Sequence, residues 1–181
     1  MKVLVISTSP RKGGNSYMLA QQFAKGAGES GSDVEYVSLI GKDIKFCCGC
    51  LTCTTGKTHK CVIDDDANEI RDKILNADVV VWATPVYYYS ISGQMKTMID
   101  RGNPLYSSDY RFRDVYLLAA AAEDEATTVD GAVKAVQGWV DCFPKAVLKG
   151  VVFAGGVNAV GDIKGHKALA EAFEMGRKIN A

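Results

Sequence analysis

Residues 2–16 read KVLVISTSPRKGGNS. The first seven form an apolar, β-branched run, and a loop rich in hydroxyls and glycine then leads into a segment of helical period at 16–28. Near-continuous apolar runs of this kind are typical of parallel strands that are buried on both faces of a sheet. The stretch therefore predicts a strand, a functional loop at its carboxyl end, and a helix.

The same alternation of strand and helix repeats along the rest of the chain. Apolar runs recur at 33–39, 78–85, 114–122 and 149–156, and segments of helical period at 67–76, 92–102, 126–142 and 165–179. Asp66 and Glu69 predict a capping box at the start of one helix. Because parallel neighbours need crossover helices, the pattern predicts an α/β fold with a doubly wound parallel sheet, whose ligand lies outside the carboxyl ends of the strands.

Length and composition limit the classes of protein that the chain can belong to. It has 181 residues and 48% hydrophobic content, which suits one domain over residues 1–181. The 21 basic and 21 acidic residues balance, and no basic stripe predicts a nucleic-acid partner. No secretory signal or membrane-length apolar run is visible, so we expect a cytoplasmic protein without a membrane span.

The loop after the first strand combines hydroxyls, an amide, cations and two glycines. Free N–H groups at a helix N-terminus and nearby donors are what a phosphate site requires. The dinucleotide and P-loop glycine patterns are missing, which favours a mononucleotide phosphate. The alternative is an ordinary turn whose polar residues only cap the helix. The candidate phosphate ligands are Ser9, Arg11, Lys12, Asn15 and Ser16.

The loop after the third strand begins with a run of aromatic residues. Thr84, Pro85 and Val86 lead into Tyr87, Tyr88 and Tyr89. Three consecutive tyrosines cannot all face one core, so at least one is expected to line a cleft for a planar aromatic ligand. Packing against a neighbouring subunit is the alternative.

These two loops together carry a resemblance to a known family. Ser9-Pro10-Arg11, Gly14-Asn15-Ser16 and Thr84-Pro85-Val86-Tyr87, followed by Ser92, Lys96, Asp100 and Arg101, resemble the NADPH-dependent FMN reductase family of flavodoxin-like proteins. The similarity covers nearly the whole chain, including residues 155–179. It implies a five-stranded parallel sheet in the order 2-1-3-4-5.

The resemblance also implies a cofactor and its ligands. FMN would bind noncovalently, with its phosphate at Ser9, Arg11, Asn15 and Ser16 and its ring along residues 85–89. NAD(P)H would be the electron donor, and no side chain need act as acid, base or nucleophile. The segment 119–128 lacks the glycines that the family often has there, which leaves the third flavin-contacting loop unassigned.

Residues 46–61, FCCGCLTCTTGKTHKC, hold five of the six cysteines of the chain. Cys47, Cys50, Cys53 and Cys61 are spaced C-x2-C-x2-C-x7-C, and Cys48 is an extra. Three cysteines at intervals of three can wrap one side of a [4Fe-4S] cluster, and a fourth can complete the coordination. The motif resembles that of the iron–sulfur flavoproteins, which belong to the same superfamily. A metal-free reduced loop, a zinc site and a redox disulfide are the alternatives.

Three functions follow from these features. The first is an enzyme, an FMN-dependent NAD(P)H oxidoreductase that passes electrons to a quinone, a flavin or a similar small acceptor. The second is an electron carrier with FMN and a [4Fe-4S] cluster, which exchanges electrons with a ferredoxin-like protein. The third is a flavin-binding regulatory protein. By analogy with the family, we expect a homodimer or homotetramer.

Overall fold

Five parallel strands form one sheet in the computed structural model, which describes residues 1–56 and 60–180. Their order is β2-β1-β3-β4-β5. The order confirms the predicted doubly wound sheet. The strands are β1 (Lys2–Ser7), β2 (Asp33–Ser38), β3 (Val79–Pro85), β4 (Asp114–Ala120) and β5 (Val147–Ala154).

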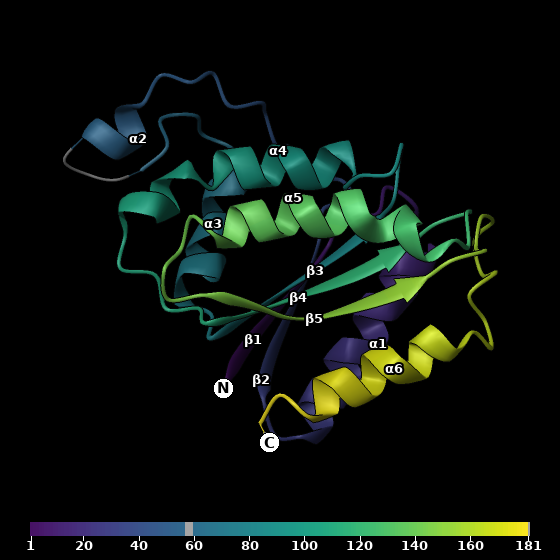
Figure 1. Cartoon of the computed structure of the whole chain (residues 1–181). Helices are drawn as coiled ribbons and strands as arrows, with labels where there is room; N and C mark the ends of the chain where they lie inside the picture. The colour runs from purple at the N-terminus through teal and green to yellow at the C-terminus, as the bar shows by residue number, and fades with distance from the viewer. Residues whose placement is uncertain (57–59, 181) are drawn as a thin grey trace.

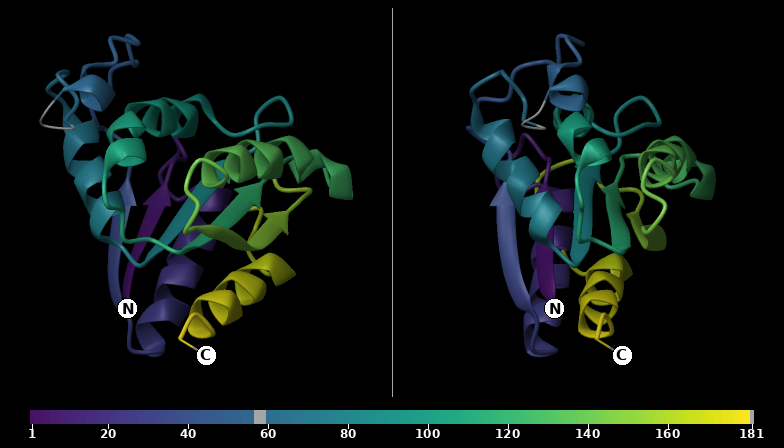
Figure 2. Two further views of the ribbon diagram at one scale, coloured as in Figure 1. Left: turned by 60° about the vertical axis from the view of Figure 1, so that its left-hand side comes forward. Right: turned by 90° about the vertical axis from the view of Figure 1, so that its left-hand side faces the viewer.

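Helices cover both faces of the sheet, as Figures 1 and 2 show. On one face lie α1 (Asn15–Glu29) and α6 (Lys167–Arg177), and on the other α3 (Asp66–Asn76), α4 (Gly93–Arg101) and α5 (Asp130–Val140). Each corresponds to a segment that its helical period predicted. The short α2 (Thr52–Thr55) and the 3-10 helices η1 (Asn103–Ser107) and η2 (Ala126–Val129) were not predicted as separate elements. Among the described residues, no helix is long and apolar enough to span a membrane.

The alternation of side chains along the buried strands gives the molecule two cores. In β1, Val3 and Val5 face α1 and α6, whereas Leu4 and Ile6 face α3 and α4. The helix pair α1 and α6 is in close contact, because a Cβ at Gly26 would lie 2.0 Å from the carbonyl oxygen of Phe173. The interiors of the central strands β1, β3 and β4 are thus covered on both faces, and the ends of the strands are left for function.

The start of α3 differs from the prediction by one residue. The N-cap is Asp65, whose side chain accepts a hydrogen bond from the backbone N–H of Ala67, and the predicted Asp66–Glu69 capping box does not form. Asp66 instead accepts a hydrogen bond from the backbone N–H of Asp43 at 2.7 Å. Both carboxylates therefore join the start of α3 to the long segment that precedes it.

The segment between β2 and α3 is the least regular part of the chain. Residues 43–65, which we call the cysteine loop, contain only the single turn of α2 as regular structure among their described residues. Figure 1 shows this loop projecting beyond α3 and α4, away from the sheet. Residues 57–59 of it lie outside the described residues.

Candidate functional site

A cavity of about 150 Å³ lies at the carboxyl edge of the sheet, where β1, β3, β4 and β5 end. We call it the edge cavity. Its position is the one that the doubly wound topology predicts for a ligand. It is lined by Ser9, Arg11, Gly14, Asn15, Ser16, Pro85, Val86, Tyr87, Ala120, Ala121, Ala122, Val157, Asn158 and Val160.

The N-terminus of α1 opens into the edge cavity. Gly14 is the N-cap, and no side chain within the described residues caps the helix. The hydroxyl oxygen of Ser16, in the first turn, is buried and has no hydrogen-bond partner in the part of the chain that the structure describes. A buried donor without a partner is costly, and the first N–H groups of a helix also lack partners within the helix. These groups are suited to bind an anion.

Two predicted phosphate ligands are used partly to build the loops. Asn15 donates from Nδ2 to the carbonyl of Ala159 at 3.0 Å, and its Oδ1 accepts from the N–H of Ile163 at 3.3 Å. Arg11 donates from one guanidinium nitrogen to the carbonyl of Asn158 at 2.9 Å. Asn15 thus holds the loop after β5 against α1, and Arg11 contacts the same loop from the rim.

The other polar candidates occupy different positions. Ser9 is buried and bonds within its own loop, since its Oγ accepts from the N–H of Arg11 at 3.1 Å. Lys12 is exposed and does not line the edge cavity. Thr84 is buried but faces α4, where its Oγ1 accepts from the N–H of Ser92 at 3.1 Å. The structure therefore brings Ser9 to the cavity and leaves Lys12 and Thr84 outside it.

The tyrosine run forms a tight turn beside the cavity. Tyr87 and Ser90 exchange backbone hydrogen bonds of 3.0 and 3.1 Å, and Tyr88 and Tyr89 between them have φ angles of +50° and +58°. Residues other than glycine rarely adopt this left-handed backbone conformation, so the turn is strained. Tyr87 lines the cavity, whereas Tyr88 is fully exposed and Tyr89 lies outside the lining.

Two further segments complete the cavity without having been predicted. Ala120, the last residue of β4, and Ala121 and Ala122 after it supply the wall that the sequence left unassigned, and Val157, Asn158 and Val160 follow β5. Apart from Asn158, these residues are small or apolar, and none of them carries a chemical signature. The available signal was their place immediately after a strand, because all parallel strands end at the same edge.

The predicted metal ligands gather on the cysteine loop. Cys47 and Cys50 are exposed, Cys61 is partly exposed and Cys53 is buried, and no disulfide joins any of the six cysteines, all of which are described. Burial raises the pKa of the Cys53 thiol, and charge on the other three sulfurs raises it further. Hydrogen bonds with Thr52 lower the pKa of the Cys50 thiol.

These four sulfurs have not converged on one point. Within residues 1–56 and 60–180, no three His, Cys, Asp or Glu side chains are close enough to hold a metal ion. In its chemistry the donor set still fits an iron–sulfur cluster, since Cys47, Cys50, Cys53 and Cys61 are four free thiols on one loop. Cys48, the extra cysteine, is exposed.

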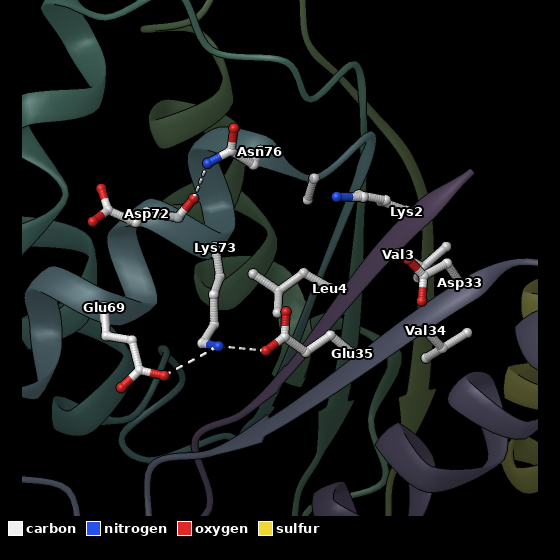
Figure 3. A pocket seen from close by; sticks show the side chains of 11 residues that line it. Lys2, Val3, Leu4, Asp33, Val34, Glu35, Glu69, Asp72, Lys73 and Asn76 are labelled. Atoms are coloured by element: carbon white, nitrogen blue, oxygen red, sulfur yellow. Dashed lines mark hydrogen bonds and ion pairs between the residues drawn. The ribbon is translucent and has the colours of Figure 1, made fainter.

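Another hollow lies at the opposite end of the sheet, against β1, β2 and α3, and has a volume of about 620 Å³ (Figure 3). Three of its charged groups pair with one another, because Lys73 donates to Glu35 at 2.5 Å and lies 3.1 Å from Glu69. Although this hollow is larger than the edge cavity, its position near the amino ends of the strands and its paired charges make it the weaker candidate for a ligand site.

Comparison with known proteins places the chain in a family. The model of the NADPH-dependent FMN reductase family matches residues 1–162. An iron–sulfur flavoprotein of Methanocaldococcus jannaschii is 39% identical over 105 residues, which are 58% of this chain and 53% of that protein. The matched segment thus spans about half the length of that relative.

Two further comparisons extend over the whole chain. A Bacillus subtilis protein, provisionally named as an NAD(P)H-dependent FMN-containing oxidoreductase, is 27% identical over all of this chain and 99% of its own length. The crystal structure of an azoreductase from Bacillus anthracis matches 99% of this chain and all of its own, with a TM-score of 0.74 and 20% identity. This likeness confirms the flavodoxin-like fold. Because the family model covers nearly all of the sequence, the chain belongs to the NADPH-dependent FMN reductase family.

Proposed function

We propose that the protein is an FMN-dependent NAD(P)H oxidoreductase that passes electrons to a quinone, a free flavin or a similar small acceptor. One observation carries the proposal beyond family membership. The uncapped N-terminus of α1, with the buried and otherwise unpartnered hydroxyl of Ser16 among the described residues, opens into the edge cavity. A phosphate there would satisfy the hydroxyl and interact favourably with the helix dipole.

The phosphate would bind to this chain in a particular way. Ser16 and the backbone N–H groups of the first turn would donate to it, and the remaining guanidinium nitrogens of Arg11 would cover it from the rim. Asn15 would act indirectly, because both ends of its amide already hold the loop after β5. Ser9 would keep the loop in shape through its hydrogen bonds to Arg11.

The flavin ring would lie at the open rim of the cavity. About 150 Å³ is less than the roughly 300 Å³ at which pockets for whole ligands begin, so only the phosphate end fits inside. Pro85 to Tyr87 on one side and Ala120 to Ala122 on the other would flank the ring, and Tyr88 and Tyr89 stay predicted contacts. When bound, FMN would supply the hydride and electron chemistry. The residues of the chain bind and orient it and exclude water from one face.

The test is the cofactor content and activity of the purified protein. We expect bound FMN, identified by chromatography after denaturation, and oxidation of NADH or NADPH in the presence of a quinone. A protein that binds FMN but oxidises neither nucleotide would contradict the enzyme and favour the regulatory alternative. A protein that does not bind FMN would contradict both.

The cysteine loop favours a second candidate, an iron–sulfur flavoprotein that carries electrons to a ferredoxin-like partner. The observation is that Cys47, Cys50, Cys53 and Cys61 are free thiols on one loop, and that the sulfurs of Cys61 and Cys47 face N–H donors of Arg101 and Asn103. Anaerobically purified protein would then contain about four iron and four sulfide per chain, as a [4Fe-4S] cluster requires. Cys53→Ser would lose the iron, whereas Cys48→Ser would keep it.

A cysteine far from the loop provides the matched control. Cys142 is exposed near the end of α5, so Cys142→Ser should leave the iron content unchanged. Flavin bands without iron in the wild-type protein would contradict the carrier and leave the simple oxidoreductase. Zinc in place of iron would be detected in the same elemental measurement.

Assembly and location follow from the same proposal. We infer a single domain that acts in the cytoplasm as a homodimer or homotetramer. The edge cavity lies beside the start of α4, and the cysteine loop lies at the end of the same helix. Because a nine-residue helix is about 14 Å long, α4 separates the two sites within one chain. In an oligomer, the cysteine loop of a second copy would be able to lie closer to the edge cavity than the cysteine loop of the same chain does. Sedimentation of the purified protein tests this, and a monomer at micromolar concentration would contradict it.

A further inference from the structure

Arg101, the last residue of α4, has a fully buried side chain that contacts both ends of the cysteine loop. Its guanidinium donates to the carbonyl of Lys45 at 2.9 Å, near the start of the loop. It also donates to the carbonyl of Ile63 at 3.1 Å and to both carboxylate oxygens of Asp65, near the end. One side chain therefore joins the two ends of a segment that has little structure of its own.

The same guanidinium reaches a predicted metal ligand. Nη2 of Arg101 lies 3.4 Å from Sγ of Cys61, the last cysteine of the quartet. From η1, Nδ2 of Asn103 lies 3.8 Å from Sγ of Cys47, the first of the quartet. The outer two sulfurs thus each face an N–H donor from the end of α4 or the start of η1.

The pairing with Asp65 keeps this arrangement rigid. Burial alone would lower the pKa of Arg101, but its hydrogen bonds to Asp65 and Cys61 outweigh that effect and raise it. The side chain of Asp65 is also fully buried, and a bidentate arginine–carboxylate pair fixes the plane of the guanidinium. The Arg101 donor is therefore in place before any metal binds.

We propose that Arg101 and Asn103 are positioning residues for the cysteine quartet. They orient the sulfurs of Cys61 and Cys47, and they would raise the reduction potential of a cluster that the quartet would hold. The proposal rests on the second candidate function above. Hydrogen bonds to ligand sulfurs and nearby positive charge stabilise the reduced, more negative cluster, and so shift its potential upward. No bond is made or broken by either residue.

The test compares four variants of the full-length protein with the wild type. Arg101→Lys keeps the charge but loses the planar fork, and Asn103→Ala removes an exposed donor with little risk to folding. Asp65→Asn disturbs the same buried pair, keeps a good helix cap for α3, and removes a negative charge. Arg111→Lys alters an arginine–aspartate pair with Asp78, far from the cysteines, and is the matched control.

Two measurements are made on each variant. The first is the reduction potential of the bound cluster, together with the rate at which a chelator removes iron. The second is backbone hydrogen exchange of residues 43–47 and 60–65, which does not depend on a cluster. Iron retention should fall roughly tenfold in Arg101→Lys.

The direction of the potential shift separates positioning from mere stability. Arg101→Lys and Asn103→Ala should shift the potential downward, Arg111→Lys should leave it unchanged, and Asp65→Asn should speed the exchange of residues 43–47 and 60–65. If Arg101→Lys or Asn103→Ala shifts the potential upward, or if both variants leave potential and exchange at wild-type values, the proposal is wrong. If the wild-type protein holds no iron, the carrier function is wrong. Hydrogen exchange then tests the positioning role by itself: faster exchange in Arg101→Lys would show that Arg101 orders the cysteine loop, and unchanged exchange would show that it does not.

Discussion

The edge cavity and the cysteine loop are both built from segments that follow strands, but the fold supports them very differently. The edge cavity draws its walls from the ends of four adjacent strands, and Asn15 and Arg11 bond one loop to another. The cysteine loop follows the outermost strand, β2, and is held at its base by Arg101. Its sulfurs lie beyond that base, near α2 and η1.

The difference explains why the loops of the edge cavity meet in the described chain, whereas the sulfurs of the cysteine loop do not converge on one point. Parallel strands end at one edge, so their loops meet whatever their composition. A loop beside an edge strand has neighbours on one side only, and its cysteines would need a bound metal to draw them together. Metal binding commonly supplies this kind of local folding energy.

The largest effect is expected at the base of the cysteine loop. Asp65→Ala removes the partner of a buried charge and the cap of α3, and should lower the free energy of unfolding by about 3–5 kcal/mol. Urea unfolding followed by circular dichroism measures it. Lys96→Ala is the control, because it breaks an exposed pair with Asp100 and should cost less than about 1 kcal/mol. Equal losses in the two variants would show that the buried pair does not hold the loop.

Ser16→Ala tests the edge cavity, and in contrast to Asp65→Ala it should change the affinity for FMN and leave the stability nearly unchanged. Because the hydroxyl has no partner among the described residues, its removal should change the free energy of unfolding by less than about 0.5 kcal/mol. A hydrogen bond to a phosphate is worth about 1.5–3 kcal/mol, so the affinity for FMN should fall roughly 10- to 100-fold.

Calorimetric titration of the apoprotein with FMN measures that affinity. Ser30→Ala is the matched control, since Ser30 lies at the other end of α1 and donates to the carbonyl of Ala27. The affinity of the Ser30→Ala protein for FMN should equal that of the wild type. A Ser16→Ala protein with unchanged affinity would place the phosphate elsewhere.

Sequence reasoning found what periodicity and local chemistry encode. The five apolar runs predicted the sheet, and the cluster around Ser9 and Ser16 predicted the position of the cavity. The sequence does not, however, separate the polar residues that face the cavity from those that hold the loops together. Asn15 looked like a ligand because an amide at a helix start binds anions, but the tertiary structure uses both ends of it to hold residues 159 and 163.

The features that were missed depend on contacts between distant parts of the chain. Val157 and Asn158 line the cavity only because β5 ends beside β4. Arg101 was noted as part of a family pattern, but its role at the cysteine loop needs a partner 36 positions earlier in the sequence. No local pattern in a single sequence reports such a pairing.

Lowering the pH should weaken the base of the cysteine loop selectively. Burial would raise the pKa of Asp65, but the hydrogen bonds from Arg101 and from the N–H groups of Lys45 and Ala67 outweigh it and lower the pKa. A carboxylate with a lowered folded-state pKa stabilises the protein fully above its unfolded-state pKa of about 3.9, and this stability is lost as the pH falls through the folded-state pKa.

Unfolding of the wild type and of Asp65→Asn between pH 7 and pH 2.5 measures this effect. The difference in the free energy of unfolding should stay constant from pH 7 to about pH 5 and shrink below about pH 4. A difference that stays constant down to pH 2.5, or that grows, would show that the charge on Asp65 does not contribute.

The smallest effect is expected in the strained turn beside the edge cavity. Tyr89 has a φ of +58°, which costs an L-residue about 1–2 kcal/mol, whereas glycine adopts it freely at an entropic cost of about 0.5–1 kcal/mol. Tyr89→Gly should therefore raise the free energy of unfolding by about 0.5 kcal/mol. Tyr106→Gly is the control, because Tyr106 is an exposed tyrosine in η1 whose φ is not positive. No backbone strain is relieved there, so only the entropic cost of glycine remains and the free energy of unfolding should fall. If both variants lose stability equally, the turn is not strained. If Tyr89→Gly is more stable but binds FMN more weakly, the strain is kept because the tyrosine serves the ligand.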